Sequence, residues 1–378
     1  MALYQCLLLG SPTDQQTSAF SATFNECLGL FDLLCGHDYT IECGIASNFV
    51  DTTATVAVFF GADGAKYPEA ARLTKLGVPV VPIVSAAARV SAELPAELRS
   101  INAMFHDPTD AGLRRVVTAA LQCLGLLPAQ RRVFVSYRRE ESADVALQLY
   151  EALSARHFDV FLDTHSVSVA SDFQAALWHR LCDSDVLVML DTPGYFTSRW
   201  TTVEWGRAIA KHISMLQLVW PGHTPTRESH LATTKKLTHA DFNGMRLTPA
   251  VVADVALELE RVRSVSVALR HSNMVGTLRT AIQDLGGSVE GVGQKRSVIL
   301  KLPSGNPLVA YPVVGVPTSV DVHNCIDLSD SRAAAVVYDH LGISEEWRRH
   351  LDWLASHVDA VKWLRSRDAD WQLADIEQ

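Results

Sequence analysis

The stretch DSDVLVMLDTPGYFTSRWTTVEWGRA, residues 183–208, joins a strongly apolar run to a segment that carries a single carboxylate. Its first part, DSDVLVMLD, is short and rich in valine and leucine, which predicts a buried strand. Its second part, SRWTTVEWGRA, predicts a helix on which Trp200 and Glu204 share one face, because they stand four residues apart. The glutamate between Trp200 and Trp205, so soon after a buried strand, is the first candidate for chemistry.

The segments on either side of this stretch alternate between strand and helix patterns. RRVFVSYRREES (131–142) predicts a strand that breaks into a polar turn, and SADVALQLYEALSAR (142–156) predicts a helix with Ser142 as its cap. FDVFLD (158–163) and SMLQLVW (214–220) are two more strand candidates. This alternation predicts a mostly parallel sheet covered by helices on both faces.

The region up to residue 127 shows the same alternation of strand and helix patterns. Its predicted strands are LYQCLLLG (3–10), TIEC (40–43), TVAVFFG (55–61) and GVPVVPIV (77–84), with helices at TSAFSATFNECLGLFDLL (17–34) and PEAARLTKL (68–76). The matching order of elements makes this region either a diverged copy of the middle region or a convergent fold. No tryptophan precedes its helical Glu69, so a copy would lack the candidate site.

In the C-terminal third, strand and helix patterns no longer alternate regularly. PGHTPTRESHLATTKKLTHADFNG (221–244) is polar and turn-rich and predicts a linker or a long surface loop. A helix at 249–263, a hairpin closed around SGNP within 297–314, and an amphipathic helix over 345–367 follow. We therefore expect three domains: an N-terminal α/β domain over 1–127, a middle domain over 131–225, and a smaller mixed α+β domain with a tryptophan-rich helix over 240–378.

Composition excludes several classes of function. A chain of 378 residues suits two or three domains, and a formal net charge of -9 argues against nucleic-acid binding as the main role. The seven cysteines show no metal-binding spacing, which predicts reduced thiols. No apolar run approaches the ~20 residues that span a bilayer, and no leader pattern is present. We expect a soluble, cytoplasmic protein without a membrane partner.

Four segments of the middle region occur in a fixed order: VFVSYRR (133–139), FDVFLD (158–163), DSDVLVML (183–190) and SRWTTVEWGRA (198–208). Together they resemble the Toll/interleukin-1 receptor (TIR) domain over about residues 131–220, and they look most like bacterial TIR domains. The resemblance implies a flavodoxin-like sheet of five parallel strands. In such sheets the ligand crevice lies beyond the carboxyl ends of the strands, where strand order reverses.

The resemblance also implies an activity, cleavage of the nicotinamide–ribose bond of NAD, with NAD as substrate and with no cofactor and no metal. Glu204 is then the catalytic carboxylate that stabilises positive charge on the ribose. Trp200 walls the pocket, Tyr137 stacks on a flat ring, and a basic side chain pairs with pyrophosphate. The binding residues are Tyr137, Arg138, Arg139, Asp163 and Trp200.

Alternatives stay open at this point. Glu204 could instead pair with Arg207 on the helix surface, and the domain could be a scaffold or could make a cyclic ADP-ribose. Ala170 and Ser171 stand where the family usually has a glycine, in a loop that mediates TIR–TIR contacts, so the mode of assembly is open. The resemblance further implies a bacterial anti-phage effector that forms homo-oligomers, with a nucleotide signal or partner protein acting on the flanking domains.

Overall fold

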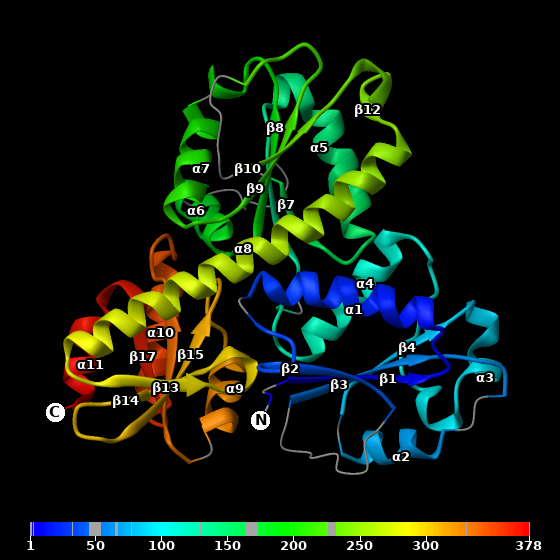
Figure 1. Cartoon of the computed structure of the whole chain (residues 1–378). Coiled ribbons are helices and arrows are strands. Elements are labelled where there is room, and N and C mark those ends of the chain that lie inside the picture. The colour runs from blue at the N-terminus through cyan, green and yellow to red at the C-terminus, as the bar shows by residue number, and fades with distance from the viewer. Residues whose placement is uncertain are drawn as a thin grey trace. The chain divides into compact units, whose positions relative to one another are not determined.

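The computed structural model describes residues 2, 4–31, 33–44, 54–64, 67–76, 78–128, 130–162, 173–197, 199–225, 232–329 and 331–377 (Figure 1). The chain divides into two compact units, Met1–Ala129 with Gly293–Arg296, and Gln130–Val292 with Ser297–Gln378. Over the described ranges, no helix is both long enough and apolar enough to cross a membrane. All seven cysteines are free thiols.

The first unit is built on a parallel sheet with the strand order β2–β1–β3–β4–β5. Its strands are β1 (Tyr4–Gly10), β2 (Tyr39–Cys43), β3 (Ala54–Phe60), β4 (Val80–Val84) and β5 (Met104–Phe105), and its helices are α1 (Asp14–Gly29), α2 (Pro68–Lys75), α3 (Val90–Glu93) and α4 (Asp110–Cys123). Helix α1 begins at a capping box, in which the Thr13 hydroxyl accepts from the Gln16 amide and the Gln16 side chain accepts from the Thr13 amide. Pro68 opens α2, as the sequence predicts.

The second unit begins with another parallel sheet, in the order β10–β9–β8–β6–β7. Its strands are β6 (Arg132–Ser136), β7 (Asp159–Leu162), β8 (Val186–Asp191), β9 (Met215–Val219) and β10 (Ala232–Lys236), with helices α5 (Arg139–Ser154), α6 (Phe173–Asp183) and α7 (Arg199–Ala210). Numbered along the chain, both sheets have the order 2-1-3-4-5, which is the flavodoxin-like arrangement. The predicted α/β class and the parallel five-stranded sheet of the middle region are confirmed.

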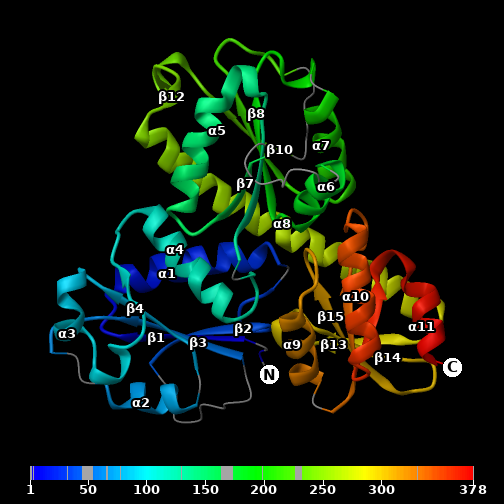
Figure 2. The same cartoon turned by 180° about the vertical axis from the view of Figure 1, so that it is seen from behind.

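Helices cover both faces of this second sheet (Figures 1 and 2). On one face α5 packs with the first half of α8 (Pro249–Asp284). On the other face, α6 and α7 close a second cluster around Phe134 and Phe161, whose rings stack 5.1 Å apart. Strand β8, in the middle of the sheet, is buried along its whole length. The core of the sheet therefore extends to the carboxyl end of β8, where the loops begin.

The rest of the second unit is a mixed sheet in the order β13–β14–β15–β16–β17. Its strands are β13 (Ser288–Val292), β14 (Val298–Lys301), β15 (Pro307–Val313), β16 (Ala333–Tyr338) and β17 (Val361–Arg365), with helices α9 (Ser319–Ser329), α10 (Glu345–His357) and α11 (Ala369–Glu377). The first three strands pair antiparallel and the last three parallel. The second half of α8 packs on this sheet through Leu278, Ala281 and Ile282, so one helix serves two cores.

Three of the predicted elements are wrong in extent or type. The segment 221–244 is not only a linker, because it contains β10, which pairs parallel with β9, and the short strand β11 (Phe242–Asn243), which pairs with β12 (Arg246–Leu247). The helix predicted over 249–263 continues to Asp284. The helix predicted over 345–367 ends at His357, and Val361–Arg365 forms β17 instead.

Each difference has a physical reason. β10 (ATTKK) is an edge strand with one neighbour, so it needs few apolar residues and gives a weak signal. Val361 and Leu364 of β17 are buried beside β16, and the spacing of these apolar residues also fits the helical period. Ser142, predicted as a cap, lies at a kink inside α5, where its φ of -143° is not helical and its hydroxyl donates to the Arg138 carbonyl at 3.1 Å.

Candidate functional site

Glu204 lies at the carboxyl ends of the strands of the second sheet, on α7, and is 3% exposed. Ser136, the last residue of β6, donates its hydroxyl hydrogen bond to Glu204 Oε2 at 2.5 Å. The Tyr195 hydroxyl lies 2.7 Å from the same Ser136 oxygen. Because the single Ser136 proton is directed to Glu204, Tyr195 is the donor to Ser136. The three residues form one donor chain that ends on the carboxylate.

Tyr195 keeps its proton in this arrangement. Burial raises its pKa well above the ordinary value, and the neighbouring Glu204 charge raises it further. Tyr195 is fully buried in the short helix Tyr195–Thr197, which directly precedes α7. Its backbone carbonyl accepts the hydroxyl of Thr201, which fixes the first turn of α7. The short segment around Tyr195 therefore positions both the first donor, Tyr195, and helix α7, which carries the acceptor Glu204.

Two other side chains of α7, those of Trp205 and Arg207, contact aromatic rings outside this donor chain. Trp205 packs edge-on against Phe196, with ring centroids 6.0 Å apart. The Arg207 guanidinium lies over the Trp178 ring of α6, 4.2 Å from its centroid. Glu204 is a buried side chain held by Ser136, which differs from the surface pair with Arg207 that the sequence left open.

A second polar cluster surrounds Asp191, the fully buried last residue of β8. Gln217 of β9 donates to Asp191 Oδ2 at 2.7 Å, and Thr234 of β10 donates to Gln217 at 3.1 Å. His223 Nε2 lies 3.3 Å from Asp191 Oδ1. Burial raises the pKa of Asp191, and Gln217 and His223 offset part of that rise.

A third cluster ties the loop after β6 to the loop after β8. Arg138 donates to Glu141 Oε1 at 3.0 Å and to the Thr197 hydroxyl at 3.1 Å, and the Gly194 amide donates to Glu141 Oε2 at 3.0 Å. A Cβ on Gly194 would lie 1.6 Å from an Arg138 nitrogen, so a larger residue there would displace the Arg138 guanidinium from this position. Burial alone raises the pKa of Glu141, but hydrogen bonds from Thr192 and Gly194 and the Arg138 charge bring it below the ordinary value.

Some of the predicted site residues lie at the strand ends, one lies in the apolar core, and others lie outside the described residues. Glu204 and Arg138 lie at the strand ends, and Arg139 is exposed at the start of α5. Tyr137 is 6% exposed and belongs to the apolar cluster under α5 and α8. Asp163, Ala170 and Ser171 lie outside the described residues, as does the side chain of Trp200, whose backbone is in α7.

Sequence reasoning missed Ser136 and Tyr195 as parts of the site. The signal for Ser136 was a lone hydroxyl closing the apolar strand VFVS, and the signal for Tyr195 was an aromatic in the turn TPGYF. In the part of the chain that the structure describes, no group of three or more His, Cys, Asp or Glu side chains is placed to hold a metal ion. At the strand ends, the structure shows the carboxylate of Glu204 held by a hydroxyl donor.

Comparisons with known proteins agree with this geometry in one respect. A family model of the TIR domain matches residues 133–253. No curated protein matches the chain.

Among solved structures, the C-terminal domain of glucosamine-fructose-6-phosphate aminotransferase from Francisella tularensis is similar at 11% identity and a TM-score of 0.22, over 71% of this chain and 85% of that one. A PurR family transcriptional regulator from Vibrio parahaemolyticus is similar at 17% identity and a TM-score of 0.19, over 69% and 94%. TM-scores of this size do not indicate a shared overall fold. The family match and the strand order agree, and the segment from residue 133 to residue 253 is a TIR domain of the bacterial type.

Proposed function

We propose that the TIR domain cleaves the bond between nicotinamide and ribose in NAD, with Glu204 as the catalytic carboxylate. The observation that supports this is the burial of Glu204 at the strand ends, 3% exposed, with Ser136 donating to it at 2.5 Å. Departure of nicotinamide leaves positive charge on the ribose, and a carboxylate in a low-dielectric site stabilises that charge strongly.

The donor chain from Tyr195 through Ser136 supports the same role. It holds one carboxylate oxygen in place before any charge develops on the substrate, so little reorganisation accompanies the reaction. Arg138 already bonds to Glu141 and Thr197, so it would meet a pyrophosphate only by exchanging these partners. Arg139, exposed at the start of α5, is a second candidate for that contact.

The test is the variant Glu204→Gln, which removes the charge and keeps the shape. We expect nicotinamide release to fall by at least about 100-fold, since the carboxylate acts mainly in the transition state. Glu151→Gln is the matched control, because that side chain is exposed near the far end of α5 and should leave the rate unchanged. Release of nicotinamide at the wild-type rate by Glu204→Gln would exclude the proposed role.

A second candidate function is a TIR scaffold without catalysis. The same burial of Glu204 favours it, because a buried carboxylate bonded to Ser136 also suits a purely structural role. In that case assembled wild-type protein releases no nicotinamide, while Glu204→Gln loses stability. Chromatography of the products separates a third outcome, cyclic ADP-ribose, from plain ADP-ribose.

The resemblance to bacterial TIR domains extends the proposal to anti-phage defence in the cytoplasm, where NAD is available. Cells that express the wild-type chain should lose NAD on phage challenge, and cells that express Glu204→Gln should not. Equal NAD levels in the two strains during infection would count against this role.

A further inference from the structure

A cavity of about 200 Å³ lies in the second unit, away from Glu204. Part of its lining follows directly on the three parallel strands of the mixed sheet: Gly315 after β15, Asp339 after β16, and Arg367 after β17. The remaining wall comes from the end of α7 and from the middle of α8. The cavity is therefore at the carboxyl ends of parallel strands, the position where α/β sheets bind ligands.

The lining carries more positive than negative charge. Lys211 is 3% exposed and Arg270 is 7% exposed, and Arg367 adds a third cation. Within the described lining, Asp339 is the only carboxylate, and it serves both Lys211 Nζ at 2.9 Å and Arg367 Nε at 3.1 Å. Three cations and one carboxylate leave an excess of two positive charges.

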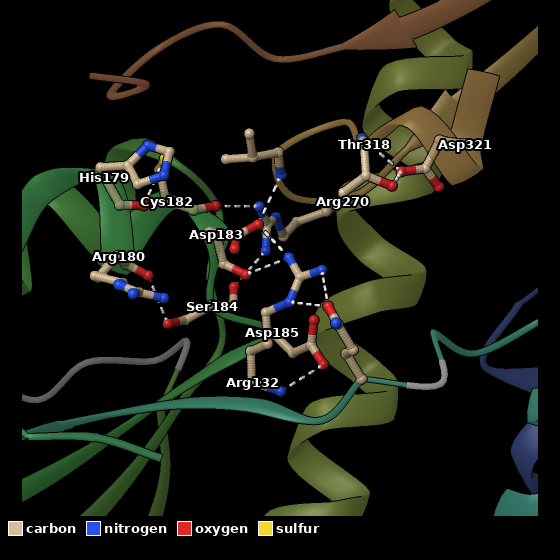
Figure 3. Close-up of polar contacts among 12 residues, drawn as sticks. Arg132, His179, Arg180, Cys182, Asp183, Ser184, Asp185, Arg270, Thr318 and Asp321 are labelled. Carbon is tan, nitrogen blue, oxygen red and sulfur yellow. Dashed lines mark hydrogen bonds and ion pairs between the residues drawn. The ribbon is translucent and has the colours of Figure 1, made fainter. Parts of the chain in front are cut away.

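The bonds of Arg270 do not remove this excess. Its guanidinium donates to the carbonyls of Ser184 at 2.7 Å and Cys182 at 3.0 Å, which are dipoles without net charge (Figure 3). The nearby acids have cations of their own: Asp183 bonds to Arg132, and Asp185 bonds to another arginine of α8. Buried charge is costly when its neighbourhood is not neutral, so the cavity favours an anion.

The pKa values of two of these cations also favour an anion in the cavity. Burial lowers the pKa of both Lys211 and Arg270, which means that the surroundings disfavour their charged forms. A bound anion would reverse this penalty. A dianion neutralises an excess of two charges, which favours a phosphate group over a single carboxylate.

The cavity wall also touches the helix that carries Glu204. Arg367 donates to the carbonyl of Ala210, the last residue of α7, at 3.2 Å, and Lys211 follows directly. Next comes His212, which lines the cavity with a φ of +54°, a left-handed conformation that usually belongs to glycine at a helix end. An occupant of the cavity thus contacts the groups that close the last turn of α7.

We propose that this cavity binds a small molecule carrying a phosphate group, and that the bound phosphate increases the activity of the strand-end site by fixing the last turn of α7. The binding half stands on the charges and the cavity alone. The regulatory half rests on the proposed NAD cleavage.

Binding is tested first, by calorimetry on the full chain with inorganic phosphate and pyrophosphate at constant ionic strength, and with chloride as the comparison. We expect saturable binding of the phosphates, at least about 10-fold weaker in Arg367→Gln, whose side chain is 47% exposed and whose loss should not prevent folding. Lys211→Met should weaken binding as well. Binding that is equal in wild type and Arg367→Gln, or no binding at millimolar phosphate, overturns the proposal.

The chain offers a matched control for the cavity wall. His157, at the end of α5, has the same left-handed conformation, with a φ of +64°, and lies outside the cavity. His212→Gly should weaken phosphate binding, because an imidazole is removed from the wall, whereas His157→Gly should not. Equal phosphate affinity in the two glycine variants would show that the wall at residue 212 is not part of a site.

The regulatory half is read from nicotinamide release with and without pyrophosphate. We expect about a five-fold or larger increase in wild type and none in Arg367→Gln. Phosphate binding without any change in the NAD cleavage rate rejects the regulation and leaves the binding site. If no condition yields nicotinamide, the proposed function fails, and calorimetry still decides the binding.

Discussion

At the scale of single residues, Ser136 is the partner that holds the carboxylate. Ser136→Ala removes the donor to Glu204 Oε2 and the acceptor of Tyr195 at once. Hydrogen bonds to charged groups contribute about 1.5–3 kcal/mol, so we expect a loss of that order in the free energy of unfolding, measured by urea denaturation. Nicotinamide release should also fall, by about 10-fold or more, because the carboxylate is no longer fixed in place.

The control for this variant is Ser264→Ala. Ser264 is also buried, on α8, but its hydroxyl donates to a neutral carbonyl of its own helix, that of Glu260, at 3.0 Å. Its loss should cost about 1 kcal/mol or less and leave NAD cleavage unchanged. A Ser136→Ala protein with wild-type stability and rate would mean that the donor chain has no part in the site.

Asp339 gives a prediction for pH. Burial alone would raise its pKa, but Lys211 and Arg367 lower it to about 2 from the ordinary 3.8. Because the folded pKa is depressed, the stabilisation is present above pH 4 and is lost as the pH falls towards 2, an amount of about 2 kcal/mol. Asp339→Asn should therefore be less stable than wild type at neutral pH, and urea denaturation should show the gap narrowing between about pH 4 and pH 2. A gap independent of pH would contradict the assignment.

At the scale of elements, α8 is anchored to the second sheet by a buried ion pair. Arg263, fully buried on α8, donates to Asp185 Oδ2, just before β8, at 2.7 Å, and the carboxylate also accepts the Arg132 amide at 3.2 Å. Asp185→Asn removes the carboxylate nearest to the buried Arg263 guanidinium and leaves only Glu260, 3.8 Å away and already paired with Arg131. We expect a loss of about 3 kcal/mol in the free energy of unfolding.

Replacing both residues of the ion pair tests whether the two charges stabilise the fold only through each other. The double variant Asp185→Asn with Arg263→Met should recover much of that loss, because a buried pair contributes little compared with an apolar side chain of similar volume. A double-mutant cycle by urea denaturation measures the coupling. Additive effects of the two substitutions would show that the pair does not act as a unit.

Elements differ in how well the sequence predicts them. The buried strand Val186–Asp191 and the helix that carries Glu204 were predictable, because an apolar run and the spacing of residues along a helix are local signals. β10 was not, since an edge strand is polar, and β17 was not, since its apolar residues continue the period of the preceding helix. Ser136 meets Glu204 across 68 residues of sequence, and a periodic pattern gives the face of a helix but not its distant partner.

At the scale of the whole molecule, two sheets share one strand order but differ at the position of the donor. β6 ends in Ser136, whereas β1 ends in Gly10, whose φ is +81° and where a Cβ would lie 2.1 Å from the Phe60 carbonyl oxygen. No side-chain hydroxyl fits there. The first unit keeps a buried carboxylate elsewhere: Glu93 accepts the Ser85 amide, just after β4, at 2.7 Å. The chemistry proposed for the chain therefore belongs to the second unit.

Assembly gives the last prediction. If NAD cleavage needs TIR–TIR contacts, the active fraction follows mass action, and in the dilute range about a 10-fold dilution should lower the nicotinamide release per chain about 10-fold. A monomeric enzyme keeps a constant rate per chain on dilution.

Glu204→Gln chains provide the decisive addition to this experiment. Added in excess to dilute wild type, they supply the contacts without the carboxylate, so the rate per wild-type chain should rise towards its concentrated value. An unchanged rate on this addition, together with a constant rate on dilution, would show that each chain carries a complete site, and control by assembly would have to be abandoned.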